Sequence, residues 1–210
     1  MPAPSFDVSK IRLGSSAFGP NETPVTTRGA DILGIEKWMD DITPNQYGNV
    51  ETYRTYRRKR CRLVRNVSGV SLPGKCLVRF KDATMGTQID GLTHTKGQGY
   101  YAVLDEHLTT LRDKDIGWVT LEGPTLVLTH TAGNASNVIA VGDKVIAATA
   151  ATSQNTSTGG RVEVFSIDAS TQVNQTANLN GLANAVGIAM TAMTTGQTNS
   201  NLLVDVQQHR

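Results

Sequence analysis

The residues that decide the fold run from Asp115 to Ala148 and read DIGWVTLEGPTLVLTHTAGNASNVIAVGDKVIAA. The apolar runs in this stretch are short, and turn-forming residues such as Glu122-Gly123-Pro124 and Gly142-Asp143 separate them. Short runs rich in Val, Ile, Leu and Thr between Gly, Pro, Asn and Asp are typical of antiparallel strands. A helix would need apolar residues at a spacing of 3.6 without such breaks. The stretch therefore predicts two or three strands at the centre of a mainly β fold, an antiparallel β-barrel or sandwich.

The composition agrees with a β-rich chain of modest charge. The 210 residues carry a net charge of +2, and charged residues make up 18% of them. A global electrostatic attraction to nucleic acid or to an anionic membrane is therefore not expected, and a charged partner would have to bind a local patch. The sequence has no apolar run long enough to cross a bilayer, and its first residues lack the pattern of a secretory signal. We expect neither a membrane partner nor secretion.

Further strands are expected on both sides of the central stretch, where apolar residues alternate with others over short runs. The expected strands are Leu63 to Val67, Gly74 to Phe80, Arg161 to Ile167, Ala185 to Met190 and Leu202 to Val206. The last two pair across the loop at Gly196, and the small residues Gly187 and Ala189 permit a neighbouring backbone to come close. Residues 86–99, which contain several glycines, predict a loop.

The first 50 residues read as an extension of a barrel domain that spans residues 51–210. Residues 1–26 contain four prolines and few apolar side chains. Proline holds the chain extended, so this segment predicts an arm that is ordered on a neighbour or on its own barrel, with a disordered tail as the alternative.

One short helix is expected from Thr27 to Ile42, because Ile32, Ile35, Trp38 or Met39, and Ile42 recur at spacings of three and four. Thr27 is placed to cap its first turn. Trp38 either anchors this helix to its own barrel or docks on another subunit.

A basic run extends from Arg54 to Arg65 and holds seven cationic residues, with Tyr53 directly before it and Tyr56 within it. From residue 58 the pattern alternates, with Arg58, Arg60 and Arg62 on one side and Lys59, Cys61 and Leu63 on the other. We expect a strand whose arginine side faces an acidic protein partner, solvent or nucleic acid. The candidate partner-contact residues are Trp38, Arg54, Arg57, Arg58, Arg60 and Arg62.

The sequence offers no catalytic or metal-binding constellation. A Gly-x-Ser-x-Gly elbow is missing, and the four histidines, at positions 94, 107, 130 and 209, show no zinc-ligand spacing. Asp113, Asp115 and Glu122 are candidates for a carboxylate pair of a hydrolase, although acidic residues at strand ends more often form turns. Cys61 and Cys76 are expected as buried small side chains in preference to a disulfide or a redox pair. We therefore expect no enzyme, cofactor or metal.

Three segments resemble the core of head decoration (capsid cement) proteins of tailed phages. They are the turn Val141-Gly142-Asp143-Lys144-Val145, the strand Ala185-Val186-Gly187-Ile188-Ala189-Met190 and the closing strand Leu202-Leu203-Val204-Asp205-Val206. Gly117-Trp118-Val119 and Glu122-Gly123-Pro124 fit the same kind of module. The resemblance covers about residues 63–207, and the segments before it and around 150–160 and 168–181 are longer than a minimal barrel needs.

The resemblance implies a non-enzymatic virion protein on the outer surface of the capsid, often a homotrimer, made in the host cytoplasm. Such a protein clamps neighbouring subunits of the major capsid protein against the pressure of packaged DNA. Its implied partners are the major capsid protein and other copies of itself, with no membrane and no direct nucleic-acid contact. Another virion subunit (tail, fibre or adaptor) and a nucleic-acid-binding protein that uses the Arg54–Arg65 run remain as alternatives.

Overall fold

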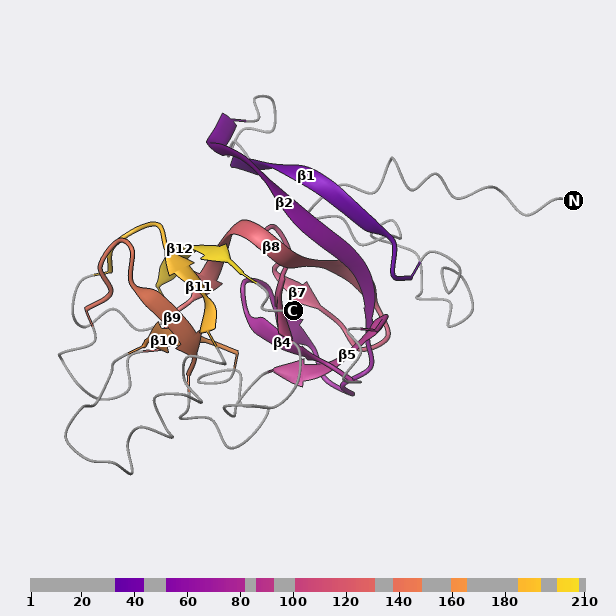
Figure 1. Cartoon of the computed structure of the whole chain (residues 1–210). Coiled ribbons are helices and arrows are strands. Elements are labelled where there is room, and N and C mark those ends of the chain that lie inside the picture. Colours follow the sequence, from indigo (N-terminus) through magenta and orange to yellow (C-terminus); the bar gives the residue numbers. More distant parts are fainter. Residues whose placement is uncertain are drawn as a thin grey trace, which may run out of the picture.

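The computed structural model describes residues 33–43, 52–81, 86–92, 101–130, 138–148, 160–165, 185–193 and 200–207 (Figure 1). These residues form strands and, within the described ranges, no helix. The strands are β1 (Glu36–Thr43), β2 (Thr52–Asn66), β3 (Leu72–Pro73), β4 (Leu77–Phe80), β5 (Gln88–Leu92), β6 (Tyr101–Leu104), β7 (Thr110–Leu111), β8 (Ile116–Leu128), β9 (Lys144–Ala147), β10 (Val162–Val164), β11 (Ala185–Ala189) and β12 (Asn201–Val206). The expected mainly β fold is confirmed. The described ranges also contain no helix with the length and hydropathy needed to cross a membrane.

One large sheet has the order β1-β2-β5-β4-β6-β8-β12-β11-β9-β10, and β3 pairs with β7 in a second, small sheet. An additional pairing of β2 with β8 closes a circuit of five strands, β2-β5-β4-β6-β8. All strand pairs are antiparallel except β2 and β5, which run parallel through Arg65 and Asn66. The sequence pattern predicted antiparallel pairing throughout, because a single two-residue parallel contact leaves no local signal.

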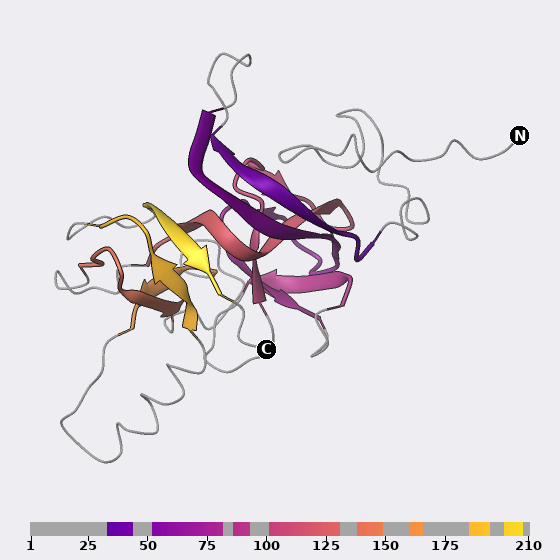
Figure 2. The ribbon, with the colours of Figure 1, turned by 45° about the horizontal axis from the view of Figure 1, so that its top comes forward.

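Two long strands, β2 and β8, connect the parts of the molecule. Figures 1 and 2 show β8 running from the group that contains β4 and β5 towards the group formed by β9 to β12. Its first part, from Ile116 to Glu122, pairs with β2, and its second part, from Gly123 to Leu128, pairs with β12. The two predicted strands on either side of Gly123-Pro124 are therefore one strand.

The change of partner along β8 explains why Gly123-Pro124 does not end the strand. Gly123 has a φ of 97°, and a side chain there would place Cβ 2.7 Å from the carbonyl oxygen of Arg58. Only glycine combines this left-handed conformation with so close a backbone neighbour. The two residues that read as a break mark the position where β8 leaves β2 and begins to pair with β12.

The predicted helix is wrong over the residues that the structure describes. Residues 36–43 form β1, which pairs antiparallel with β2, while residues 27–32 lie outside the described ranges. The helical spacing has another cause, since Ile35 and Met39 pack from a strand against a buried cluster that contains Leu63 and Trp118. Along β1 the chain follows a period of two, in which Glu36, Trp38 and Asp40 are exposed and Asp41 is buried. Pairing with β2 satisfies the backbone groups, so the tertiary contact overrides the local pattern.

The loop predicted for residues 86–99 is wrong at residues 88–92, which form β5 between β2 and β4. The predicted arm, residues 1–26, lies outside the described residues, as do most residues of the 150–160 and 168–181 segments. Strand β5 was not predicted from the sequence because Asp90 and Gly91 interrupt its short apolar run. In the structure, pairing with β2 on one side and β4 on the other stabilises it.

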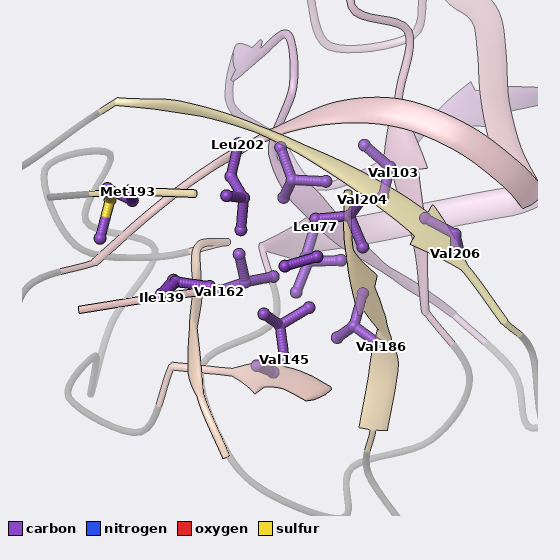
Figure 3. Close-up of a cluster of buried hydrophobic side chains, with 13 residues drawn as sticks. Leu77, Val103, Ile139, Val145, Val162, Val186, Met193, Leu202, Val204 and Val206 are labelled. Atoms are coloured by element: carbon purple, nitrogen blue, oxygen red, sulfur yellow. The ribbon is translucent and has the colours of Figure 1, made fainter. Parts of the chain in front are cut away.

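Two buried clusters share β4 and β6 as a common wall. Leu77 and Val103 face a cluster with the C-terminal strands, and Val78, Ala102 and Leu104 face a cluster inside the five-strand circuit. Figure 3 shows the first cluster, in which Val186, Val204 and Val206 of β11 and β12 point towards Leu77. Because both faces of β4 and β6 are covered, their sequences are largely apolar, with Arg79 as the charged residue of β4. Cys61 and Cys76 are buried and free, as expected from the sequence.

Candidate interaction surface

The outer face of the β1–β2 hairpin carries Trp38 and the alternating arginines. Residues face one another across the two strands in the pairs Glu36 and Arg62, Trp38 and Arg60, and Asp40 and Arg58. The predicted alternation of β2 is confirmed, since Lys59, Cys61 and Leu63 on its other side are buried. We call the six outer residues the hairpin face.

Ion pairs connect most of the charges of the hairpin face. Arg62 donates to Glu36 from Nε at 2.9 Å and also from Nη2, and Arg58 Nε lies 3.4 Å from Asp40 Oδ1. Arg58 Nη2 also donates to the carbonyl oxygen of Trp38 at 3.0 Å. The charged residues therefore form a ladder on each side of the tryptophan.

Trp38 itself remains 51% exposed in the middle of this ladder. A tryptophan buries a large apolar area when it meets a partner, and an exposed one on a strand is a candidate anchor. It does not anchor a helix, because the chain there is a strand. Docking of Trp38 on another subunit stays a prediction.

Two further cations of the basic run, Arg57 and Arg60, also have acidic partners within the chain. Arg57 Nη1 lies 3.0 Å from Asp205 Oδ2 of β12, and Arg60 Nε lies 3.6 Å from Glu122 Oε2 of β8. A phosphate would have to compete with these carboxylates for the arginines. The pairing therefore favours a contact with protein over the nucleic-acid alternative.

Arg54 and Lys59 point inward and share two buried carboxylates. Glu106, in the turn after β6, accepts hydrogen bonds from Arg54 Nη1 and Nη2 at 2.8 and 2.9 Å and from Lys59 Nζ at 2.5 Å. Asp41 of β1 accepts from Arg54 Nε at 3.1 Å and from Nη2, and lies 3.9 Å from Lys59 Nζ. We call these four residues the buried ion cluster.

The electrostatics of the buried ion cluster follow from this geometry. Burial alone would raise the pKa of Glu106, but the hydrogen bonds from Arg54 and the charge of Lys59 outweigh it and lower the pKa to about 2. The Glu106 carboxylate is therefore ionised at neutral pH, and both of its oxygens accept hydrogen bonds within the chain. Sequence reasoning missed this cluster, although two signals were present. Asp40 and Asp41 lie at the C-terminal end of the predicted helix, where the helix dipole disfavours negative charge. Asp105 and Glu106 follow directly after an apolar run.

A bulge in β2 lies next to the buried ion cluster. Asp40 pairs with Arg58 and Ile42 with Tyr53, so the four residues from Arg54 to Arg57 stand opposite Asp41 alone. Asp41 Oδ2 also accepts a hydrogen bond from Thr55 Oγ1 at 2.8 Å. Tyr56, within the bulge, has a φ of 54° and is 86% exposed. We call residues 54–57 the Tyr56 bulge.

The three segments that carry the family resemblance lie side by side. β9 pairs with β11, and β11 pairs with β12. Gly142, with a φ of 92°, donates its backbone N–H to Ala189 at 2.8 Å, and Ala189 donates to the carbonyl oxygen of Asp143 at 2.8 Å. The Val-Gly-Asp turn is therefore hydrogen-bonded to the strand that follows it in the motif.

The close backbone approach expected at Gly187 is present, because a Cβ there would lie 2.1 Å from the carbonyl oxygen of Asp205. Glycine at this position is thus required by the pairing of β11 with β12.

Two of the candidate carboxylates of a hydrolase, Asp113 and Asp115, lie in one turn, where burial and the charge of Asp113 raise the pKa of Asp115. Asp113 Oδ1 accepts from the backbone N–H of Gly69 at 2.9 Å, and the backbone of Asp115 belongs to the same turn region through Arg112. Glu122 pairs with Arg60. Among the described residues, no group of three or more His, Cys, Asp or Glu side chains is arranged to hold a metal ion, and His94 and His209 lie outside those residues.

Comparison with known proteins gives one distant structural similarity. No family model matches the chain, and no curated protein matches its sequence. A solved structure, the head fiber gp8.5 N base in bacteriophage phi29, shares 14% identity with a TM-score of 0.38, over 71% of this chain and 98% of that one. A similarity at this level defines neither the fold nor the function of this chain.

Proposed function

We propose that this chain is a non-enzymatic virion protein that binds the outer surface of a phage capsid and cements neighbouring subunits of the major capsid protein. The observation that carries the proposal is the assembly of the three resembling segments into one hydrogen-bonded unit, β9-β11-β12. The three segments are separated in the sequence but are adjacent in the sheet, as expected if together they form the core that resembles the decoration proteins. The five-strand circuit supplies a barrel-like body for this unit.

The hairpin face supports a role in protein assembly. Its charges are matched within the chain, and its tryptophan is exposed. Interfaces between proteins place aromatic anchors within a polar rim, whereas phosphate-binding surfaces need cations that are free to neutralise the backbone. The proposed partners are the major capsid protein and other copies of this chain, in a homotrimer.

The direct test uses purified heads that lack this protein. Added protein is expected to saturate sites on the outer surface, to appear there in electron micrographs and to raise the temperature at which heads release DNA. Trp38→Ala should lower the occupancy, whereas Val138→Ala, a change at a 49% exposed residue outside the hairpin, should not. Absence of binding to heads would contradict the proposal. Location on the tail or on a fibre would favour the alternative of another virion subunit.

A further inference from the structure

The Tyr56 bulge holds an aromatic side chain on a strained backbone in solvent. For a residue other than glycine, the left-handed conformation is strained, and asparagine or aspartate would tolerate it better than tyrosine. The side chain does not recover this cost by burial, because it is 86% exposed. Strained residues of this kind persist when the surrounding structure enforces them, and they cluster at functional sites.

The buried ion cluster enforces the bulge from inside. Arg54 and Thr55 are both bound to Asp41, and Arg54 is also bound to Glu106. These contacts fix the residues before Tyr56, and the pairing of Arg58 with Asp40 fixes those after it. Bulges redirect side chains in this way at sheet edges and binding sites. The contacts of Arg54, Thr55 and Arg58 thus hold the backbone at Tyr56 in the conformation that exposes its side chain.

The residues that follow Tyr56 add a charge preference. Arg57 and Arg58 have side chains that are 51% and 62% exposed. Each is paired with one carboxylate through part of its guanidinium group, which carries five N–H donors. Donors therefore remain for a further acceptor, and arginine binds a carboxylate through charge-assisted hydrogen bonds.

We propose that the Tyr56 bulge is the anchor that docks into an acidic protein surface, in which a hollow receives the tyrosine ring and a neighbouring carboxylate binds Arg57 or Arg58. Tyrosine, tryptophan and arginine are the residues that contribute most to binding at protein interfaces, and Arg58 connects this anchor to Trp38 through the Trp38 carbonyl. The inference rests on the proposed function and specifies the chemistry of the capsid partner. Nucleic acid is a poorer fit, because a polyanion needs a row of uncompensated cations, whereas the ion pairs with Asp205 and Asp40 leave the bulge with little net charge.

The first test separates binding from stability by replacing Tyr56→Gly. Glycine adopts a positive φ without strain, so the urea midpoint of unfolding should stay the same or rise. Binding to heads that lack this protein should weaken about 30-fold, the effect of removing one strong anchor. The matched control is Lys114→Gly, since Lys114 is also exposed with a φ of 68° but lies in the turn before β8. It should bind like the unchanged protein.

The second test addresses the acidic partner. Arg57→Gln should weaken head binding about fivefold at low salt and reduce its salt dependence, because it removes one charge-assisted contact. Lys144→Gln makes the same change of charge at the exposed start of β9 and should alter neither quantity.

The outcomes separate the inference from the proposed function. If the unchanged protein does not bind heads, the proposed function fails and the inference fails with it. If it binds and Tyr56→Gly binds equally well, only the inference is wrong. If the unchanged protein binds a single-stranded 30-nucleotide DNA and Tyr56→Gly loses this binding, the assignment to an acidic protein is overturned.

Discussion

Lys59 Nζ lies 2.5 Å from Glu106 Oε1, and the two side chains are only 1% and 2% exposed. Arg54 and Asp41 complete the buried ion cluster, so that two cations and two carboxylates share one enclosed site without net charge. Buried charges are tolerated under this condition. The cluster joins β1, β2 and the turn after β6, and the position of the hairpin therefore depends on it.

Glu106→Gln should strongly destabilise the fold. The amide would leave Arg54 and Lys59 without their shared charge, and removing one partner of a buried ion pair costs about 3–5 kcal/mol. Urea unfolding followed by circular dichroism measures the loss. The control is Glu122→Gln, because Glu122 is 48% exposed and pairs with Arg60 at 3.6 Å, a contact worth less than about 1 kcal/mol. Equal losses in the two variants would contradict the role of the cluster.

Stability should fall in acid through the same carboxylate. Burial opposes ionisation of Glu106, yet Arg54 and Lys59 lower its pKa from 4.5 to about 2. A group whose pKa is lower in the folded state stabilises the fold above its unfolded pKa and loses this contribution as the pH falls through the folded value. The difference in unfolding free energy between the unchanged protein and Glu106→Gln should therefore be full at pH 6 and shrink between pH 4.5 and 2. A difference that does not change over this range would show that Glu106 is not the responsible group.

The strands with regular alternation were predictable from sequence, and the helix was not. In β2 from Arg58 to Leu63, arginines alternate with the buried residues Lys59, Cys61 and Leu63, so local chemistry and the fold agree. Residues 36–43 carry both periods at once, and the long-range pairing with β2 selects the strand. The pattern within residues 36–43 does not show that the following strand will pair with them.

The candidate surface was predictable only in part. The alternation of Arg58, Arg60 and Arg62 placed them on one side of a strand, which the structure confirms. Their acidic partners were not predictable, because Asp40 and Glu36 lie on β1 and Glu122 lies on β8. The bulge that exposes Tyr56 depends on Asp41 and on the turn at Glu106, so no pattern within β2 indicates it.

Gly187→Ala should disrupt the unit that carries the family resemblance. The new Cβ would lie 2.1 Å from the carbonyl oxygen of Asp205, and backbone on both strands would have to move apart. We expect a loss of at least about 2 kcal/mol, the range of overpacked cores. Gly142→Ala is the comparison, since it meets no atom within 4 Å and is opposed only by its φ of 92°, which costs about 1–2 kcal/mol. Urea midpoints measure both, and a milder effect at Gly187 would contradict the close pairing of β11 with β12.

The two cysteines should be unreactive in the folded protein. Burial raises the pKa of Cys61 to about 12 and that of Cys76 to about 11, so the reactive thiolate is scarce at pH 8. A disulfide reagent such as dithionitrobenzoate should detect no thiol in native protein and two in 6 M guanidinium chloride. Rapid reaction of one thiol in native protein would mean that its strand opens readily.

The two tryptophans should report the hairpin face and the interior separately. Trp38 is 51% exposed and Trp118 is fully buried. In the unchanged protein, acrylamide should therefore quench the fluorescence of one accessible tryptophan, Trp38, and leave that of a protected one, Trp118. Trp38→Phe should remove the accessible class and leave emission at shorter wavelength, while a substitution on an exposed strand face changes stability by less than about 0.5 kcal/mol. Tyr101→Phe, which retains both tryptophans, serves as the control for quenching. A single protected class in the unchanged protein would mean that Trp38 is already covered in solution by another copy of the chain, and the capsid would then have to bind elsewhere.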